Sequence, residues 1–210
     1  MEVLVLATDE LKEELLECPV SSDIQFHWLT APASVSSFPA ADACIDLLFE
    51  HSPERINWLK QLKVPLIVIN SVISCLADIQ EDFVRINGWS TFLKRPVMEA
   101  VGRKAATRQL ATHLFSLLGR KTEWVPDIPG MITPRVVACI INEAFMALEE
   151  KVSHEKEINT ALKLGTNYPY GPLEWGQKIG LQPVYTLLET LSKEEDRYQP
   201  AGLLKKKILV

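Results

Sequence analysis

The stretch from Pro129 to Leu191 constrains the fold of this chain more than any other part. Residues 131–151 have the length of a long helix, and its apolar side chains lie around much of the helix surface: Val136, Val137, Ile140, Ile141, Phe145 and Leu148. A helix that is hydrophobic nearly all round must be buried on several sides. The sequence therefore predicts further helices packed around this one.

Helix-capping and helix-breaking residues after residue 151 indicate where those helices begin and end. Ser153 is predicted to cap a helix that Gly165 ends, and Pro172 is predicted to begin another that Gly180 ends. An all-helical domain over residues 127–210 follows from these signals. Such a domain, of about 80 residues, is small for so much apolar surface, so we expect a two-fold partner and hence a homodimer through the helical domain.

The N-terminal part has the pattern of an α/β domain. Val3–Leu6 is a short apolar run typical of a buried parallel strand, a helix follows up to Glu17, and Ile24–Leu29 has the pattern of a second strand. Further strands are predicted within residues 41–50, 66–69 and 122–125. The sequence therefore predicts a trimmed Rossmann-like doubly wound parallel sheet over residues 1–126, followed by the helical domain.

Several marks in the helical region occur in a fixed order: Pro129-Gly130, Asn142-Glu143-Ala144, Ile158 with Ala161–Gly165, Pro169–Leu173 and Ile179–Leu181. With these marks the region resembles the C-terminal helical domain of the 3-hydroxyacyl-CoA dehydrogenase family. That family dimerises through this domain, so the resemblance also implies a homodimer. It further implies a small molecule of the acyl-CoA kind as ligand.

A second segment, residues 83–101, is similar to the family's most diagnostic stretch without a gap. In this register the family's general base, a histidine, is replaced by Ser90, and a nearby asparagine by Leu93. The glutamate that orients the histidine falls at Gly102, and a substrate-contacting asparagine falls at Pro134. Oxidising an alcohol needs a base near neutral pKa, and losing it costs on the order of 10²–10⁴ in rate.

The turn after the first strand should show whether a dinucleotide binds. The family resemblance places Ala7, Asp9 and Lys12 at the three glycine positions. Those glycines allow a tight turn, close approach of the pyrophosphate, and packing of helix on strand. A side chain at each position crowds the phosphates, and Asp9 puts negative charge where an anion would bind. We therefore expect no cofactor; NAD is the cofactor if the alternative stated below holds.

Other polar residues are weaker candidates. Glu50 and Arg55 match acidic and basic positions that the family keeps near the cofactor, and Asn70 resembles its polar loop near nicotinamide and substrate. The alternatives are a helix N-terminal charge, a surface arginine and a simple turn. His51 is predicted at the C-terminal end of a parallel strand, so it is a candidate substitute base, with a surface loop histidine as the alternative. A Ser90–His51 nucleophile pair lacks the GxSxG elbow.

Bulk properties exclude several classes of partner. The net charge of −5 gives no basic field for nucleic acid, and no apolar run is long enough to span a membrane. The four cysteines are widely spaced, without a metal-ligand pattern, so we expect no metal. Residues 1–7 lead into Asp9 without a basic start or cleavage site, which indicates no signal peptide and a cytoplasmic protein.

These observations favour one hypothesis and leave a second open. The first is a homodimer of 3-hydroxyacyl-CoA dehydrogenase fold that has lost NAD-dependent catalysis and works by binding. The alternative is an active NAD-dependent oxidoreductase on a 3-hydroxyacyl-CoA or related hydroxy acid, in fatty-acid metabolism. The turn at Ala7–Lys12 and the Ser90/Gly102 pair separate the two.

Overall fold

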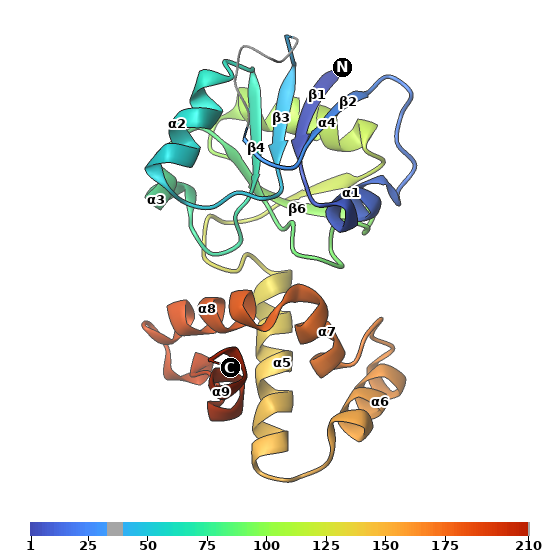
Figure 1. Ribbon diagram of the computed structural model, residues 1–210, viewed down its shortest axis with the longest axis vertical. Coiled ribbons are helices and arrows are strands. Elements are labelled where there is room, and N and C mark those ends of the chain that lie inside the picture. The colour runs from blue at the N-terminus through green and yellow to red at the C-terminus, as the bar shows by residue number, and fades with distance from the viewer. Residues whose placement is uncertain (33–39, 210) are drawn as a thin grey trace. The chain divides into compact units, whose positions relative to one another are not determined.

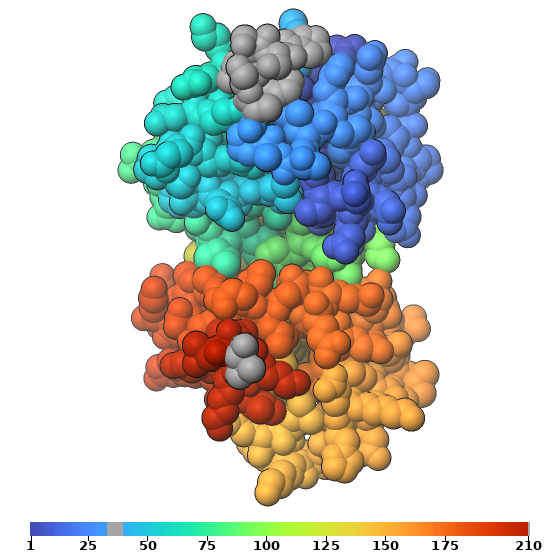
Figure 2. All heavy atoms as spheres, in the orientation of Figure 1, coloured from blue at the N-terminus to red at the C-terminus, as the bar shows by residue number. Residues whose placement is uncertain are grey.

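The computed structural model describes residues 1–32 and 40–209. The chain forms two compact units, Met1–Met131 and Ile132–Val210. Figure 1 shows that the first unit contains the sheet and that the second is helical. The space-filling view of Figure 2 shows the packed surface of each unit, with the second unit in orange to red.

The first unit is built on one seven-stranded sheet of order β2-β1-β3-β4-β5-β6-β7. Its strands are β1 Glu2–Leu6, β2 Gln25–Leu29, β3 Ala43–Asp46, β4 Leu66–Asn70, β5 Val84–Ile86, β6 Val97–Val101 and β7 Lys121–Trp124. Strands β1 to β5 are parallel, as predicted for β1 to β4, whereas β5 and β6 were not predicted as strands. β6 is antiparallel to β5, and β7 is parallel to β6. The wholly parallel sheet was therefore wrong at this end, because the short connection over residues 87–96 suits an antiparallel pair.

Helices cover both faces of this sheet: α1 Asp9–Leu16, α2 Pro53–Gln61, α3 Leu76–Ile79 and α4 Ala105–Leu117. The side chains of β1 alternate between two core clusters, as a strand buried on both faces requires. Val3 and Val5 pack in the cluster that includes residues of α1 and α4. Leu4 and Leu6 pack in the cluster that includes residues of α2 and α3. This confirms the α/β, Rossmann-like class of the first unit.

The second unit is all-helical, as predicted, with α5 Thr133–Glu149, α6 Glu155–Thr166, α7 Pro172–Ile179, α8 Leu181–Ser192, the 3-10 helix η2 Asp196–Tyr198 and α9 Gly202–Ile208. α5 packs against α7, α8 and α9 (Figure 1). Ile141 and Phe145 of α5 are buried, but Val136 is 53% exposed. The long helix is thus buried on most sides, and one apolar stripe is left uncovered by the unit itself.

Two of the predicted helix ends in this unit were wrong in detail. α6 continues past Gly165 to Thr166, and Asn167 ends it with a left-handed φ of 56°. Asparagine tolerates this conformation better than other side chains do, so it can replace the expected glycine. The N-cap of α6 is His154 rather than Ser153, whose hydroxyl bonds to Glu157. Gly180 ends α7 as predicted, with a φ of 94°.

In residues 1–32 and 40–209, no helix is both long enough and apolar enough to cross a bilayer.

Candidate functional site

The turn from β1 into α1 lies at the carboxyl edge of the parallel strands, where open α/β sheets bind their ligands. The backbone N–H of Ala7 donates to the carbonyl of Leu29 at 3.0 Å. Thr8 caps α1, and its hydroxyl accepts from the backbone N–H of Leu11 at 3.3 Å. None of residues 7–12 has a positive φ, so this turn has no conformational need for glycine.

The side chains of this turn oppose an anion. Asp9 and Glu10 are exposed in the first turn of α1, where a helix dipole would otherwise favour a phosphate. Lys12 does not compensate, because its ammonium lies 5.0 Å from the ring centre of Trp28 on β2. The residues present therefore do not fit the pyrophosphate of a dinucleotide in the manner of a glycine turn.

Beyond the end of β3, a buried ion pair fixes the next part of the edge. Asp46 is fully buried, and Arg55 holds it with Nε–Oδ2 and Nη2–Oδ1 distances of 2.6 and 2.7 Å. Burial raises the pKa of Asp46, and the hydrogen bonds and charge of Arg55 oppose that rise. The surface-arginine alternative was wrong, since the Arg55 side chain is only 10% exposed. Sequence reasoning missed Asp46, although an acid at a strand end before a helical arginine was a usable signal.

A pocket of about 430 Å³ opens beside this pair. Its lining comes from the ends of β2 and β3 and the start of α2: Thr30, Ala31, Pro32, Leu48, Glu50, Ser52, Glu54, Arg55 and Trp58. Strands β2 and β3 lie on either side of β1, so the pocket is at the topological switch point of the sheet. Because Asp46 neutralises Arg55, the carboxylates of Glu50 and Glu54 leave the lining acidic.

The side-chain amide of Asn70, at the end of β4, forms hydrogen bonds with backbone groups of the protein. Its Nδ2 donates to the carbonyls of Leu47 and Gly88 at 3.2 and 3.3 Å, and its Oδ1 accepts from the N–H of Gly88 at 3.0 Å. A Cβ on Gly88 would lie 2.7 Å from Cγ of Asn70, so the glycine is required by close packing. Asn70 thus joins the ends of three strands, and its predicted contact with a ligand stays a prediction.

Ser90, at the family's base position, is held by a carboxylate from α1. Its Oγ donates to Oε1 of Glu14 at 2.9 Å, and the N–H of Thr91 donates to both oxygens of Glu14 at 2.7 and 2.8 Å. No sequence signal pointed to Glu14, because it lies 76 residues away along the chain. This geometry makes Ser90 a hydrogen-bond donor that is engaged within the fold.

The remaining predicted residues are not among the hydrogen-bond partners of Ser90 in the described part of the chain. His51 is exposed, and its ring stacks on Phe49 at 6.5 Å between centres. In the described part of the chain, no hydrogen bond joins His51 to Ser90. Leu93 is fully buried, and its carbonyl accepts from Nε of Arg120 at 2.8 Å. Gly102 lies half-buried in the first unit, and Pro134 is buried in the first turn of α5.

Two buried arginines, by contrast, have clear structural roles. Arg85 on β5 donates to the carbonyl of Ser74 at 2.7 Å and pairs with Asp127 at 3.1 Å; burial lowers its pKa. Arg120 donates to the carbonyls of Leu118 and Leu15, at 2.6 and 2.8 Å, as well as to Leu93. Burial also lowers the pKa of Arg120. Sequence reasoning had placed Arg85 only within the segment 83–101 that resembles the family, and it had missed Arg120.

No metal centre accompanies these residues. Within the described ranges, no group of three or more His, Cys, Asp or Glu side chains is placed to hold a metal ion.

A Rossmann-like sheet followed by a helical unit defines the class of two-domain dehydrogenase folds. The family model for the C-terminal domain of 3-hydroxyacyl-CoA dehydrogenase matches residues 130–209, and the N-terminal region matches relatives of the same kind. Residues 130–209 are a C-terminal domain of the 3-hydroxyacyl-CoA dehydrogenase family, and the N-terminal region is similar to members of that family, which confirms the resemblance found in the sequence.

Three comparisons describe this relationship. The 3-hydroxyadipyl-CoA dehydrogenase of Escherichia coli K12 is 44% identical over 113 residues, which are 53% of this chain and 24% of that protein. A probable 3-hydroxybutyryl-CoA dehydrogenase of Bacillus subtilis is 28% identical over 217 residues, 96% of this chain and 75% of that protein. The crystal structure of (S)-3-hydroxybutyryl-CoA dehydrogenase from Ralstonia eutropha matches with a TM-score of 0.76 at 19% identity. The match covers 99% of this chain and 93% of that chain, and it shows that the two share a fold. The chain thus spans about a quarter of the first relative.

Proposed function

We propose that this chain is a homodimeric binding protein of the 3-hydroxyacyl-CoA dehydrogenase family that no longer transfers hydride to NAD. The observation that carries the proposal is the β1–α1 turn. Side chains stand at all three glycine positions, and Asp9 and Glu10 occupy the first turn of α1, next to where a pyrophosphate would bind. A carboxylate at that place repels a phosphate instead of attracting it.

The environment of Ser90 supports the same proposal. Hydride transfer from an alcohol requires a group that accepts the hydroxyl proton. The hydroxyl of Ser90 donates a hydrogen bond to the carboxylate of Glu14, and both oxygens of that carboxylate also accept from the N–H of Thr91. Ser90 and Glu14 are thus engaged with protein groups, and Ser90 acts in this contact as a donor, not as an acceptor for a substrate proton.

A second candidate function is NAD-dependent oxidation of a 3-hydroxyacyl-CoA or a related hydroxy acid, in fatty-acid metabolism. The comparisons favour this candidate, since the relatives carry the names of such dehydrogenases and one solved dehydrogenase shares the fold over nearly the whole chain. The geometry of the β1–α1 turn favours the first candidate. An acyl-CoA-like molecule is the ligand class under either.

The homodimer is proposed to form through the apolar stripe of α5. Val136 is 53% exposed, and Cys139 and Ile140 on the next turn are half-buried. Their spacing places them on one face of the helix. A second copy of the chain would cover this face by two-fold symmetry, with the same stripe on both protomers.

One titration separates the two functions. NADH fluorescence and the melting temperature are followed while NADH, and then acetoacetyl-CoA, is added to the full-length protein. The first candidate predicts no saturable change with NADH, and no NADH consumption when the thioester is present. Saturable NADH binding followed by consumption would overturn the first candidate and support the second. A matched variant, Asp9→Asn with Glu10→Gln, tests whether acidic charge is what excludes the nucleotide.

A further inference from the structure

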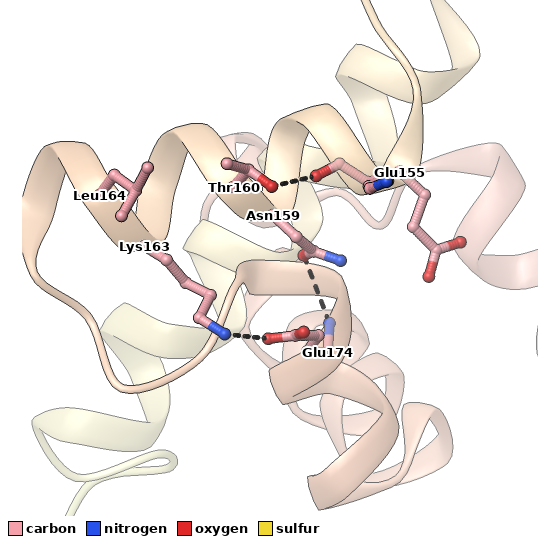
Figure 3. Close-up of a pocket in the computed structure, with 7 residues that line it drawn as sticks. Glu155, Asn159, Thr160, Lys163, Leu164 and Glu174 are labelled. Atoms are coloured by element: carbon pink, nitrogen blue, oxygen red, sulfur yellow. Dashed lines mark hydrogen bonds and ion pairs between the residues drawn. The ribbon is translucent and has the colours of Figure 1, made fainter.

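A polar groove lies in the second unit, on helices α6 and α7. Its volume is about 700 Å³, within the size range of small-molecule sites. One face of α6 and one residue of α7 line it: Glu155, Lys156, Asn159, Thr160, Lys163, Leu164 and Glu174. Figure 3 shows these side chains, with α6 running above the start of α7.

Asn159 forms the floor of the groove, and its orientation is fixed by hydrogen bonding. The side chain is more than nine-tenths buried, since the residue is 8% exposed. Its Oδ1 accepts from the backbone N–H groups of Leu173 and Glu174 at 2.9 and 3.4 Å, which caps α7. Because both partners are donors, the oxygen must face α7, and the Nδ2 amide must face the other way. Figure 3 shows this nitrogen directed into the groove.

Within the described residues, that Nδ2 group has no hydrogen-bond acceptor. It is also absent from the buried polar atoms that lack a partner, so it is open to the groove. A buried amide donor in a native protein ordinarily has an acceptor, supplied by the protein, by water or by a ligand. The Nδ2 group of Asn159 is therefore a hydrogen-bond donor available to an oxygen acceptor in the groove.

At the rim of the groove, the carboxylates have hydrogen-bond or ion-pair partners within the part of the protein that the structure describes, but one of the ammonium groups does not. Oε2 of Glu174 accepts from the N–H of Gly171 at 3.0 Å and pairs with Lys163 at 3.3 Å, and these contacts hold the pKa of Glu174 below its usual value. Glu155 accepts from Nε2 of Gln177 at 3.1 Å. Both carboxylates are thus engaged, whereas the ammonium of Lys156 has no acceptor among the described residues. The unmet groups of the groove are both donors.

An apolar side chain continues the groove beside these donors. Leu164 is 82% exposed, although it lines the same face of α6 two turns beyond Lys156. An exposed leucine next to polar donors offers contact for an aliphatic tail.

We propose that this groove binds a small carboxylate with a short apolar tail. The carboxylate accepts from Nδ2 of Asn159 and from the ammonium of Lys156, and the tail lies on Leu164. A charged acceptor suits this site because hydrogen bonds between an ammonium or amide and a carboxylate are stronger than neutral ones. This inference concerns the second unit and does not depend on whether NAD binds the first.

The test uses hexanoate as the probe and the full-length, isotope-labelled protein. Hexanoate is titrated while the side-chain amide of Asn159 and the backbone amides of α6 and α7 are followed by NMR. The expected result is saturable shifts confined to these resonances, with a Kd on the order of 1 mM for so open a site. Hexylammonium, with the same tail and the opposite charge, is the matched ligand control and should shift none of them.

Asn159→Asp separates binding from structure. An aspartate still caps α7, and its charge suits a helix N-terminus, so the melting temperature should be retained. It replaces the Nδ2 donor with a carboxylate oxygen, so hexanoate affinity should fall at least about tenfold. Lys156→Gln should also weaken binding, whereas Lys193→Gln, at the exposed end of α8, should not.

Three outcomes would overturn the proposal. The first is the absence of saturable shifts on α6 and α7 in the wild-type protein. The second is equal binding of hexanoate to the wild type and to Asn159→Asp. The third is stronger binding of hexylammonium than of hexanoate, which would show that the carboxylates of Glu155 and Glu174 dominate the groove.

Discussion

The Asp46–Arg55 pair allows a prediction whose magnitude follows from burial. Asp46 is fully buried and Arg55 is 10% exposed, so Arg55→Ala leaves an uncompensated carboxylate inside the first unit. Breaking a buried pair from one side typically costs about 3–5 kcal/mol in the free energy of unfolding. For a chain of this length, that corresponds to a fall in melting temperature of about 6–20 °C.

The pH dependence of this loss gives a second readout. Burial already raises the pKa of Asp46 above its ordinary value of 3.8, and Arg55 opposes the rise. Without Arg55 the native pKa rises further, so the native state binds more protons than the unfolded chain between the two values. Stability of the variant therefore increases as the pH falls through the raised pKa, and the cost of the substitution shrinks.

Urea unfolding of wild type and Arg55→Ala at pH 7 and pH 5 measures both effects. Arg103→Ala is the matched control, because Arg103 is 46% exposed and lies 3.8 Å from Asp127, so its loss should cost at most about 1 kcal/mol. A loss for Arg55→Ala below about 1 kcal/mol at pH 7 would refute the reasoning. So would an equal loss at both pH values.

Three further predictions follow from contacts elsewhere. Glu14→Ala leaves the buried N–H of Thr91 without its acceptor and should lower the free energy of unfolding by about 1–3 kcal/mol; an unchanged urea midpoint would contradict this. Gly88→Ala places a Cβ 2.7 Å from Cγ of Asn70, so it should destabilise by about 1–3 kcal/mol in thermal melts, and a neutral result would show that the strand ends can relax. Val136→Glu should convert the proposed dimer to monomer in light scattering with little change in melting temperature, and an unchanged dimer would exclude the α5 stripe as the interface.

The elements that sequence reasoning placed correctly are those with a strong local period. The apolar runs of β1 and β4 predict their structures because a strand covered on both faces must bury the side chains of both. Proline at the start of α7 and Gly180 at its end predict its limits because their backbone preferences are local. Such signals need no knowledge of distant residues.

The errors concern contacts between distant segments. The reversal of β6 depends on the length of its connection to β5, and the period of an apolar strand is the same in either direction. The burial of Arg55 depends on Asp46 being fixed at a strand end, and the engagement of Ser90 depends on Glu14 in α1. The partner of Ser90 is set by the tertiary structure, so no local pattern in the sequence identifies Glu14. Asp46, nine residues before Arg55 at the end of β3, was within reach of a local signal that the sequence reasoning did not use.

Arg120 has a consequence for how the first unit comes apart. One guanidinium serves the carbonyl ends of α1 and α4 and the segment that carries Ser90, through Leu15, Leu118 and Leu93. Carbonyls from three pieces of chain that are remote from one another in sequence accept from this one side chain, so fraying of any one piece loosens the guanidinium to which the other two are bound. Protection of the amides in these pieces against hydrogen exchange should therefore be lost in one cooperative opening. Lysine could not replace Arg120, because it lacks the planar guanidinium that donates to several carbonyls at once.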